Sequence, residues 1–161
     1  MFDLLIKNGT VIDGTGSPGK KTDIALLGGK ISDIGSFGES EAKEIINAEN
    51  MIVCPGFIDP HTHYDAQLFW DPYASPSNLH GVTSVVMGNC GFSIAPISDP
   101  SDAEYLGAML VQVEGMSAEA LRLGVDWEWN SFEDYLGRLD GRVGVNVAAM
   151  VGHCALRRTV M

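Results

Sequence analysis

The feature that most constrains the fold is a change of residue pattern at Pro55-Gly56. Before it, short β-prone runs alternate with turn pairs such as Asn8-Gly9 and Gly28-Gly29. After it, apolar strand-like runs alternate with helical ones. Turn pairs between β-prone runs predict a small β-rich module, whereas strand–helix alternation predicts a parallel sheet covered by helices. We therefore expect an α/β chain with two domains, residues 1–55 and residues 56–161.

The first module is expected to be part of a β-sandwich. Asn8-Gly9 predicts a hairpin between the first two strands, and Gly28-Gly29 predicts a second hairpin. The expected strands are Phe2–Lys7, Thr10–Ile12, Asp23–Leu27, Lys30–Ile34, Glu44–Ala48 and Met51–Val53.

The second module should contain three parallel strands and three helices, with no helix after the last strand. The capping-box sequence at Ser101–Glu104 predicts the start of one helix. A (β/α)8 barrel needs roughly 250 residues, and the 106 residues from Gly56 to Met161 allow about three strand–helix units. A truncated, partial barrel is favoured over a small open sheet. The expected strands are Phe57–His63, Thr83–Met87 and Gly144–Val151, and the expected helices run from Ser101 to about Glu114, after Ser117, and from Ser131 to about Leu139.

Two histidines two positions apart close the first of these strands. Because side chains alternate along a strand, His61 and His63 should point the same way, and the carboxyl ends of barrel strands face the active site. Zinc accepts imidazole nitrogen readily, so the pair is a candidate metal site; the alternative is two surface or turn histidines. Asp59 has the same parity and could orient one imidazole.

Polar residues also follow the second and third strands. Cys90, between glycines in Gly88-Asn89-Cys90-Gly91, is a candidate zinc ligand as a thiolate, or else a buried inert cysteine. His153 could touch substrate or a metal-bound water, or could be a structural histidine bonded to backbone. Arg157 could meet a substrate carboxylate or make a surface ion pair.

Charge and cysteine content exclude several classes of partner. The net charge of −11 argues against nucleic acid and against an anionic membrane surface. The sequence contains no run of about 18 apolar residues, the length that a membrane-spanning helix needs. The three cysteines show no disulfide-scaffold spacing, which favours a reduced, cytoplasmic location.

Several segments resemble known enzymes. Pro55–Asp65, with Gly56-Phe57-Ile58-Asp59-Pro60-His61-Thr62-His63, is similar to the first-strand signature of the amidohydrolase superfamily, and Asp3–Gly14 resembles the opening of the same enzymes. His80–Val86 and Met87–Pro96 resemble the N-acyl-D-amino-acid deacylase (D-aminoacylase) branch. The resemblance covers essentially the whole chain. Pro60 departs from it, because other residues are common at that position.

The resemblance implies a fold, a cofactor and a reaction. It implies a β-sandwich built from both chain ends, a TIM-like (β/α)8 barrel between them, and His61, His63 and Cys90 as ligands of one or two zinc ions. Further histidine ligands and the catalytic aspartate would come from later strands, beyond Met161, so this chain would hold no catalytic residue. The implied reaction is zinc-dependent hydrolysis of N-acyl-D-amino acids to a carboxylate and a D-amino acid.

Two alternatives remain at this stage. One is a hydantoinase- or dihydropyrimidinase-like cyclic amidase, which Cys90 argues against because those enzymes generally bridge two metals through a lysine carboxylate. The other is a non-catalytic fragment or split subunit that needs a complementary C-terminal portion of the same enzyme. In either form, we expect the chain alone to be inactive.

Overall fold

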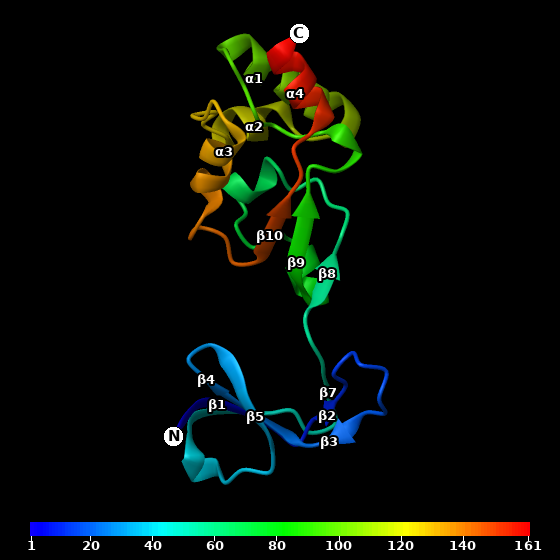
Figure 1. Ribbon diagram of the computed structural model, residues 1–161, viewed down its shortest axis with the longest axis vertical. Coiled ribbons are helices and arrows are strands. Elements are labelled where there is room, and N and C mark those ends of the chain that lie inside the picture. The colour runs from blue at the N-terminus through cyan, green and yellow to red at the C-terminus, as the bar shows by residue number, and fades with distance from the viewer. The chain divides into compact units, whose positions relative to one another are not determined.

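The computed structural model describes residues 1–161 and divides into two compact units, Met1–Pro55 and Gly56–Met161 (Figure 1). No helix in either unit combines the length and the apolar character that crossing a membrane requires. We describe each unit by itself.

The first unit contains two small sheets. One has the strand order β5-β4-β1-β6 and the other the order β3-β2-β7. A short 3-10 helix, η1 (Glu39–Glu41), precedes β6. The strands are β1 (Phe2–Lys7), β2 (Thr10–Val11), β3 (Lys20–Lys21), β4 (Asp23–Leu27), β5 (Lys30–Gly35), β6 (Ala42–Asn47) and β7 (Ile52–Val53).

The hairpin predicted at Asn8-Gly9 is wrong. Strand β1 pairs with β4 and β6, whereas β2 pairs with β3 and β7. Asn8 does take a positive φ of 65°, but its backbone N–H donates to Asp23 and its side chain to Asn47. These hydrogen bonds to distant residues fix Asn8 at the point where the chain passes from the first sheet to the second. The hairpin predicted at Gly28-Gly29 is confirmed, since β4 and β5 pair antiparallel across it.

The second unit is built on a parallel three-stranded sheet with the order β10-β9-β8, as the α/β pattern predicted. The elements are β8 (Phe57–Asp59), η2 (Gln67–Phe69), η3 (Ser77–His80), β9 (Val82–Met87), η4 (Asn89–Gly91), α1 (Pro100–Glu114), α2 (Ala118–Gly124), α3 (Phe132–Leu139), β10 (Asn146–Ala149) and α4 (His153–Val160).

Helix α1 begins one residue earlier than expected, and its cap is different. Asp99, not Ser101, is the N-cap: its carboxylate accepts the N–H of Ser101, and Asp102 completes a reciprocal capping box. Pro100 occupies the first helical position, where its fixed φ suits a helix start. The helices expected after Ser117 and from Ser131 are confirmed, and each of these serines is the N-cap of its helix.

The expectation of no helix after the last strand is wrong, because α4 follows β10 directly. Ala155 of α4 is fully buried, and the Arg158 guanidinium binds the Asp102 carboxylate of α1 with Nε 2.8 Å from Oδ1. A buried apolar contact and this ion pair hold the helix in place.

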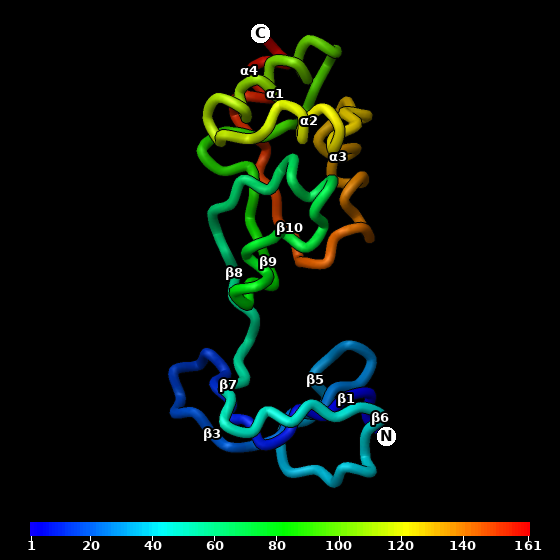
Figure 2. Tube along the Cα trace, turned by 180° about the vertical axis from the view of Figure 1, so that it is seen from behind, coloured from blue at the N-terminus to red at the C-terminus, as the bar shows by residue number.

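The core of the second unit lies between β9 and the helices. Val85 and Met87 of β9 pack in one buried cluster with Leu106 and Leu110 of α1 and Tyr135 of α3. In both views α1 and α4 lie beyond the carboxyl ends of β9 and β10 (Figures 1 and 2). The loops that follow β9 and β10 therefore lie between the sheet and these helices.

Candidate metal centre

Strand β8 ends at Asp59, so His61 and His63 lie in the loop after it rather than within the expected strand Phe57–His63. Pro60 lacks the backbone donor that would extend the pairing. Thr62 fixes the loop instead: it is buried, and both its N–H and its hydroxyl donate to the Val86 carbonyl of β9, at 2.9 and 2.8 Å. With Thr62 turned inward, the two imidazoles lie together with ring centroids 5.4 Å apart.

Cys90 is presented by a tight turn directly after β9. Gly88, Cys90 and Gly91 all take positive φ, at 80°, 56° and 79°. A Cβ at Gly88 would overlap the carbonyl oxygen of Met150, so only glycine fits there. Cys90 has a Cβ and still takes the left-handed conformation, a strained state that is enriched at functional sites.

The two loops bring three metal-ligating side chains together. One donor atom from each of His61, His63 and Cys90 lies within 4.8 Å of the other two, and His61 Nε2 is 3.1 Å from Cys90 Sγ. Ligands on a shared tetrahedral zinc ion, at about 2.0–2.3 Å from it, lie roughly 3.5 Å apart. Two imidazoles and a thiolate are a donor set that zinc prefers. The residues therefore fit zinc and leave a fourth position open.

Two acidic residues border this group, and neither was singled out from the sequence. Asp65 is buried and accepts the Gly88 N–H at 3.2 Å, which ties the histidine loop to the cysteine turn. Burial raises the pKa of the Asp65 carboxyl to about 6. Glu114, the last residue of α1, has Oε1 3.4 Å from His63 Nδ1. The two-residue spacing after His63 could have indicated Asp65, whereas no local pattern marks Glu114.

The other predicted site residues lie beside the group rather than in it. Asp59 accepts the backbone N–H of His61 at 3.2 Å and contacts no imidazole nitrogen through a hydrogen bond. His153 is the exposed first residue of α4, next to Gly91 of the cysteine turn. Arg157 is exposed one helical turn further on and lines a cavity of about 290 Å³ with Tyr105 and Cys154.

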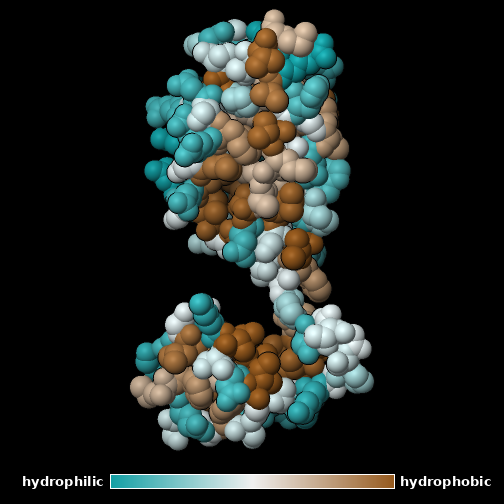
Figure 3. Space-filling view, in the orientation of Figure 1, coloured by the Kyte–Doolittle hydropathy of each residue, from teal (hydrophilic) through white to brown (hydrophobic).

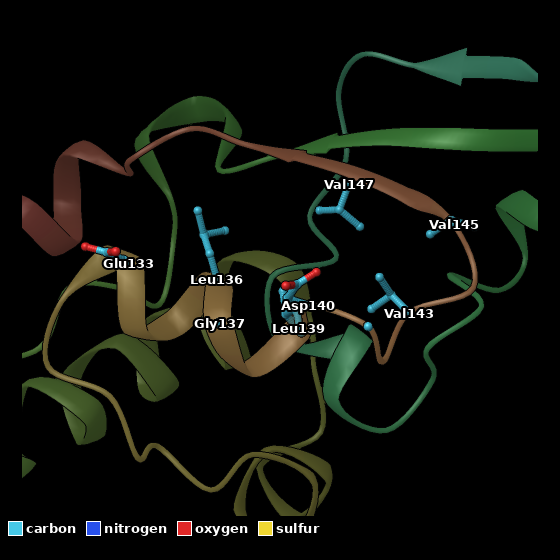
Figure 4. A pocket seen from close by; sticks show the side chains of 9 residues that line it. Glu133, Leu136, Gly137, Leu139, Asp140, Val143, Val145 and Val147 are labelled. Atoms are coloured by element: carbon cyan, nitrogen blue, oxygen red, sulfur yellow. The ribbon is translucent and has the colours of Figure 1, made fainter.

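A larger cavity, of about 590 Å³, lies away from the metal-ligating group. Helix α3 and the segment leading into β10 form its walls, and Leu136, Val143 and Val147 point toward the shared space (Figure 4). None of His61, His63 and Cys90 lines it. The cavity is a mainly apolar groove that also includes Glu133 and Asp140, and it lies beside β10, an edge strand of the sheet.

Comparison with known proteins places these features in a family context. Residues 44–161 match the amidohydrolase family model. The D-aminoacylase of Alcaligenes xylosoxydans xylosoxydans is 37% identical over 99% of this chain and 31% of its own length.

Two solved structures are similar over nearly the whole chain. A D-aminoacylase from a study of its binuclear metal centre gives a TM-score of 0.81 at 38% identity, covering all of this chain and 32% of its own. The N-acyl-D-glutamate deacylase of Bordetella bronchiseptica, complexed with zinc and a phosphonate inhibitor, gives 0.74 at 34% identity, covering 99% and 31%. The chain thus spans about a third of the length of the relatives it matches.

Proposed function

Because this chain belongs to the amidohydrolase family, we propose that it supplies part of the metal centre of an enzyme that hydrolyses N-acyl-D-amino acids. The reaction cleaves the amide bond and gives a carboxylate and a D-amino acid. The observation that carries the proposal is the convergence of His61, His63 and Cys90 beyond the ends of two adjacent parallel strands. The names of two similar relatives, D-aminoacylase and N-acyl-D-glutamate deacylase, support the substrate class.

The proposed cofactor is zinc, as one or two ions held by His61, His63 and Cys90. A zinc ion bound there supplies Lewis acidity, which activates water and polarises the amide carbonyl. The chain's own residues fix the geometry: Thr62 holds the histidine loop on β9, and Asp65 holds the cysteine turn through Gly88. The zinc complex of the N-acyl-D-glutamate deacylase supports this choice of metal.

We assign substrate contacts to helix α4. His153 and Arg157 are four residues apart, so they share one face of the helix, and both are exposed. Arg157 suits the carboxylate of an acyl amino acid, and His153 suits its amide or a water molecule. The catalytic aspartate is assigned to a region outside residues 1–161, so we expect no turnover from this chain alone.

The two units are assigned to the corresponding parts of a larger fold. Residues 1–55 would contribute to a β-sandwich, and residues 56–161 the first strand–helix units of a (β/α)8 barrel. A complementary C-terminal portion would then pair with the free edge of β10 and fill the apolar groove of Figure 4. The cyclic-amidase alternative is weaker, because a D-aminoacylase and an N-acyl-D-glutamate deacylase each match 99% of this chain, whereas an allantoinase matches 53% of it.

Cobalt binding tests the metal centre directly. Co²⁺ replaces Zn²⁺ at such sites and gives a thiolate-to-metal absorption band when a cysteine is a ligand. We expect this band in the wild-type chain and its loss in Cys90→Ser, while Cys54→Ser, which alters another exposed free cysteine, keeps it. A band that survives in Cys90→Ser would refute the proposed ligand set.

Substrate class needs a separate assay. A protein that joins this chain to the remaining regions found in its relatives should release amine from N-acyl-D-amino acids after zinc loading. Hydrolysis of hydantoins or dihydropyrimidines in preference to these substrates would favour the cyclic-amidase alternative instead.

A further inference from the structure

One ring nitrogen of the candidate metal centre lacks a hydrogen-bond partner. His63 Nδ1 is buried from solvent, yet it makes no hydrogen bond. The acidic group nearest to it, Glu114 Oε1, is 3.4 Å away, slightly beyond good hydrogen-bond distance. A buried imidazole nitrogen normally has a partner, and the Glu114 carboxylate is the acidic group that lies within 4 Å of this one.

The position of Glu114 is unfavourable for a carboxylate that has no cationic or N–H partner. It is the last residue of α1, where the helix dipole disfavours negative charge. Its side chain is only 20% exposed, and it lies close enough to the buried Asp65 for the two carboxylates to repel. An N–H donor on His63 would offset these costs, and no other ion pair involves Glu114.

Glu114 is placed to support a ligand rather than to act as one. The group of mutually close donor atoms consists of His61, His63 and Cys90, without Glu114. Its contact is with the Nδ1 side of the His63 ring, which leaves Nε2 as the nitrogen available to a metal. Metal-ligating histidines commonly donate their other N–H to a carboxylate, which fixes the tautomer and the ring orientation.

We propose that Glu114 is a positioning residue, which accepts the Nδ1–H of His63 and so presents Nε2 as the metal ligand. The proposal rests on the metal centre proposed above. It extends that centre to the carboxyl-terminal end of α1, a helix that lies beyond the strand ends (Figure 1). Docking of α1 and orientation of His63 are then coupled.

The tautomer of His63 can be read without any metal. In the ¹⁵N-labelled, metal-free chain, at an alkaline pH where the side-chain ¹⁵N shifts themselves show a neutral ring, those shifts report which ring nitrogen is protonated. We expect Nδ1–H in the wild type and in Glu114→Gln, whose amide oxygen still accepts. In Glu114→Ala we expect a mixture of tautomers. Glu104→Ala, an exposed glutamate of the same helix, should match the wild type.

Zinc affinity, measured by competition with a chromophoric chelator, provides the second readout. Loss of an orienting carboxylate typically weakens metal binding about 10- to 100-fold, so we expect a loss of this size in Glu114→Ala and a smaller one in Glu114→Gln. A wild-type His63 that carries its proton on Nε2 would overturn the inference. So would a Glu114→Ala variant that keeps the wild-type tautomer and binds zinc with an affinity within twofold of the wild type. If the wild type bound no zinc, the metal centre would fail, and the tautomer data would still decide the role of Glu114.

Discussion

At the scale of single residues, Cys90 combines a reactive side chain with a strained backbone. Its φ of 56° lies in the left-handed region, which costs a residue with a Cβ about 1–2 kcal/mol. The neighbouring glycines at positions 88 and 91 take similar φ values without that cost. A glycine at position 90 would take this φ without the steric cost. Cysteine at this position therefore lowers the stability of the folded chain.

Cys90→Gly should therefore stabilise the metal-free chain while removing metal binding. Relief of strain is partly offset by the extra freedom of glycine in the unfolded state, about 0.5–1 kcal/mol. We expect a net gain of about 0.5–1 kcal/mol in the free energy of unfolding, measured in urea. Cys90→Ala, which loses the thiol but keeps the Cβ, is the matched control and should show no gain. Equal stability of the two variants would mean that the turn is not strained.

At the scale of elements, Asp102 joins α1 to α4. It is buried, and its carboxylate accepts from the N–H and hydroxyl of Ser98, at 2.8 and 2.7 Å, and from Arg158 of α4. The hydrogen bonds from Ser98, together with Arg158, lower the pKa of the Asp102 carboxyl below its ordinary value. One side chain thus holds the start of α1 and fixes the helix that carries His153 and Arg157.

Asp102→Asn should lower the free energy of unfolding at pH 7 by about 1–3 kcal/mol, the usual cost of weakening buried hydrogen bonds to a charged group. Because the folded-state pKa is the lower one, the carboxylate stabilises the fold above the unfolded-state pKa, near 4. That contribution is lost as the pH falls through the folded-state pKa.

The difference between Asp102→Asn and the wild type should accordingly shrink on acidification, as measured by urea unfolding between pH 7 and pH 3. Asp33→Asn, at an exposed position of β5, should change little at any pH. If the difference in the free energy of unfolding stayed constant across this range, the stabilising effect of Asp102 would not depend on its negative charge.

Local patterns predicted the elements whose partners are local. The apolar runs that form β9 and β10, the helix starts at Ser117 and Ser131 and the Gly28-Gly29 hairpin are each indicated by residues a few positions apart. The Asn8-Gly9 hairpin failed because Asn8 bonds to Asp23 and Asn47, which lie far along the chain. Helix α4 was missed because an ion pair with α1 helps to hold it.

The same distinction applies to the candidate site. His61, His63 and Cys90 could be singled out because they lie at or just after the ends of the expected strands, and the carboxyl ends of neighbouring parallel strands meet at one edge. Glu114 could not, because its approach to His63 depends on how α1 packs across 51 positions of sequence. Sequence spacing therefore singled out the three proposed ligands, and tertiary packing supplied the carboxylate beside them.

At the scale of the whole chain, the second unit leaves apolar surface and strand edges uncovered. Strands β8 and β10 are both edge strands, and Phe57 and Ile58 of β8 are 59% and 68% exposed. Apolar residues gather on the face of this unit seen in Figure 3. Exposed edges with apolar side chains promote association, whereas a net charge of −11 opposes it.

The balance between these two effects predicts how the isolated chain behaves with salt. At about 0.1 M salt the Debye length is roughly 10 Å, and it shortens to about 3 Å at 1 M. Added salt should screen the charge repulsion and leave the apolar attraction in place. We therefore expect light scattering to show self-association that increases with salt and with protein concentration.

Ile58→Lys should reduce this association, because it places a charge on the exposed edge of β8. Leu79→Lys provides the matched control: Leu79 is 78% exposed but lies in η3, outside any strand, so its substitution should have a smaller effect. If both variants reduced association equally, added charge alone would explain the result. If the wild type stayed monomeric at high salt, the edge of β8 would not be an association surface, and the case for a complementary portion that covers this sheet would lose its physical basis.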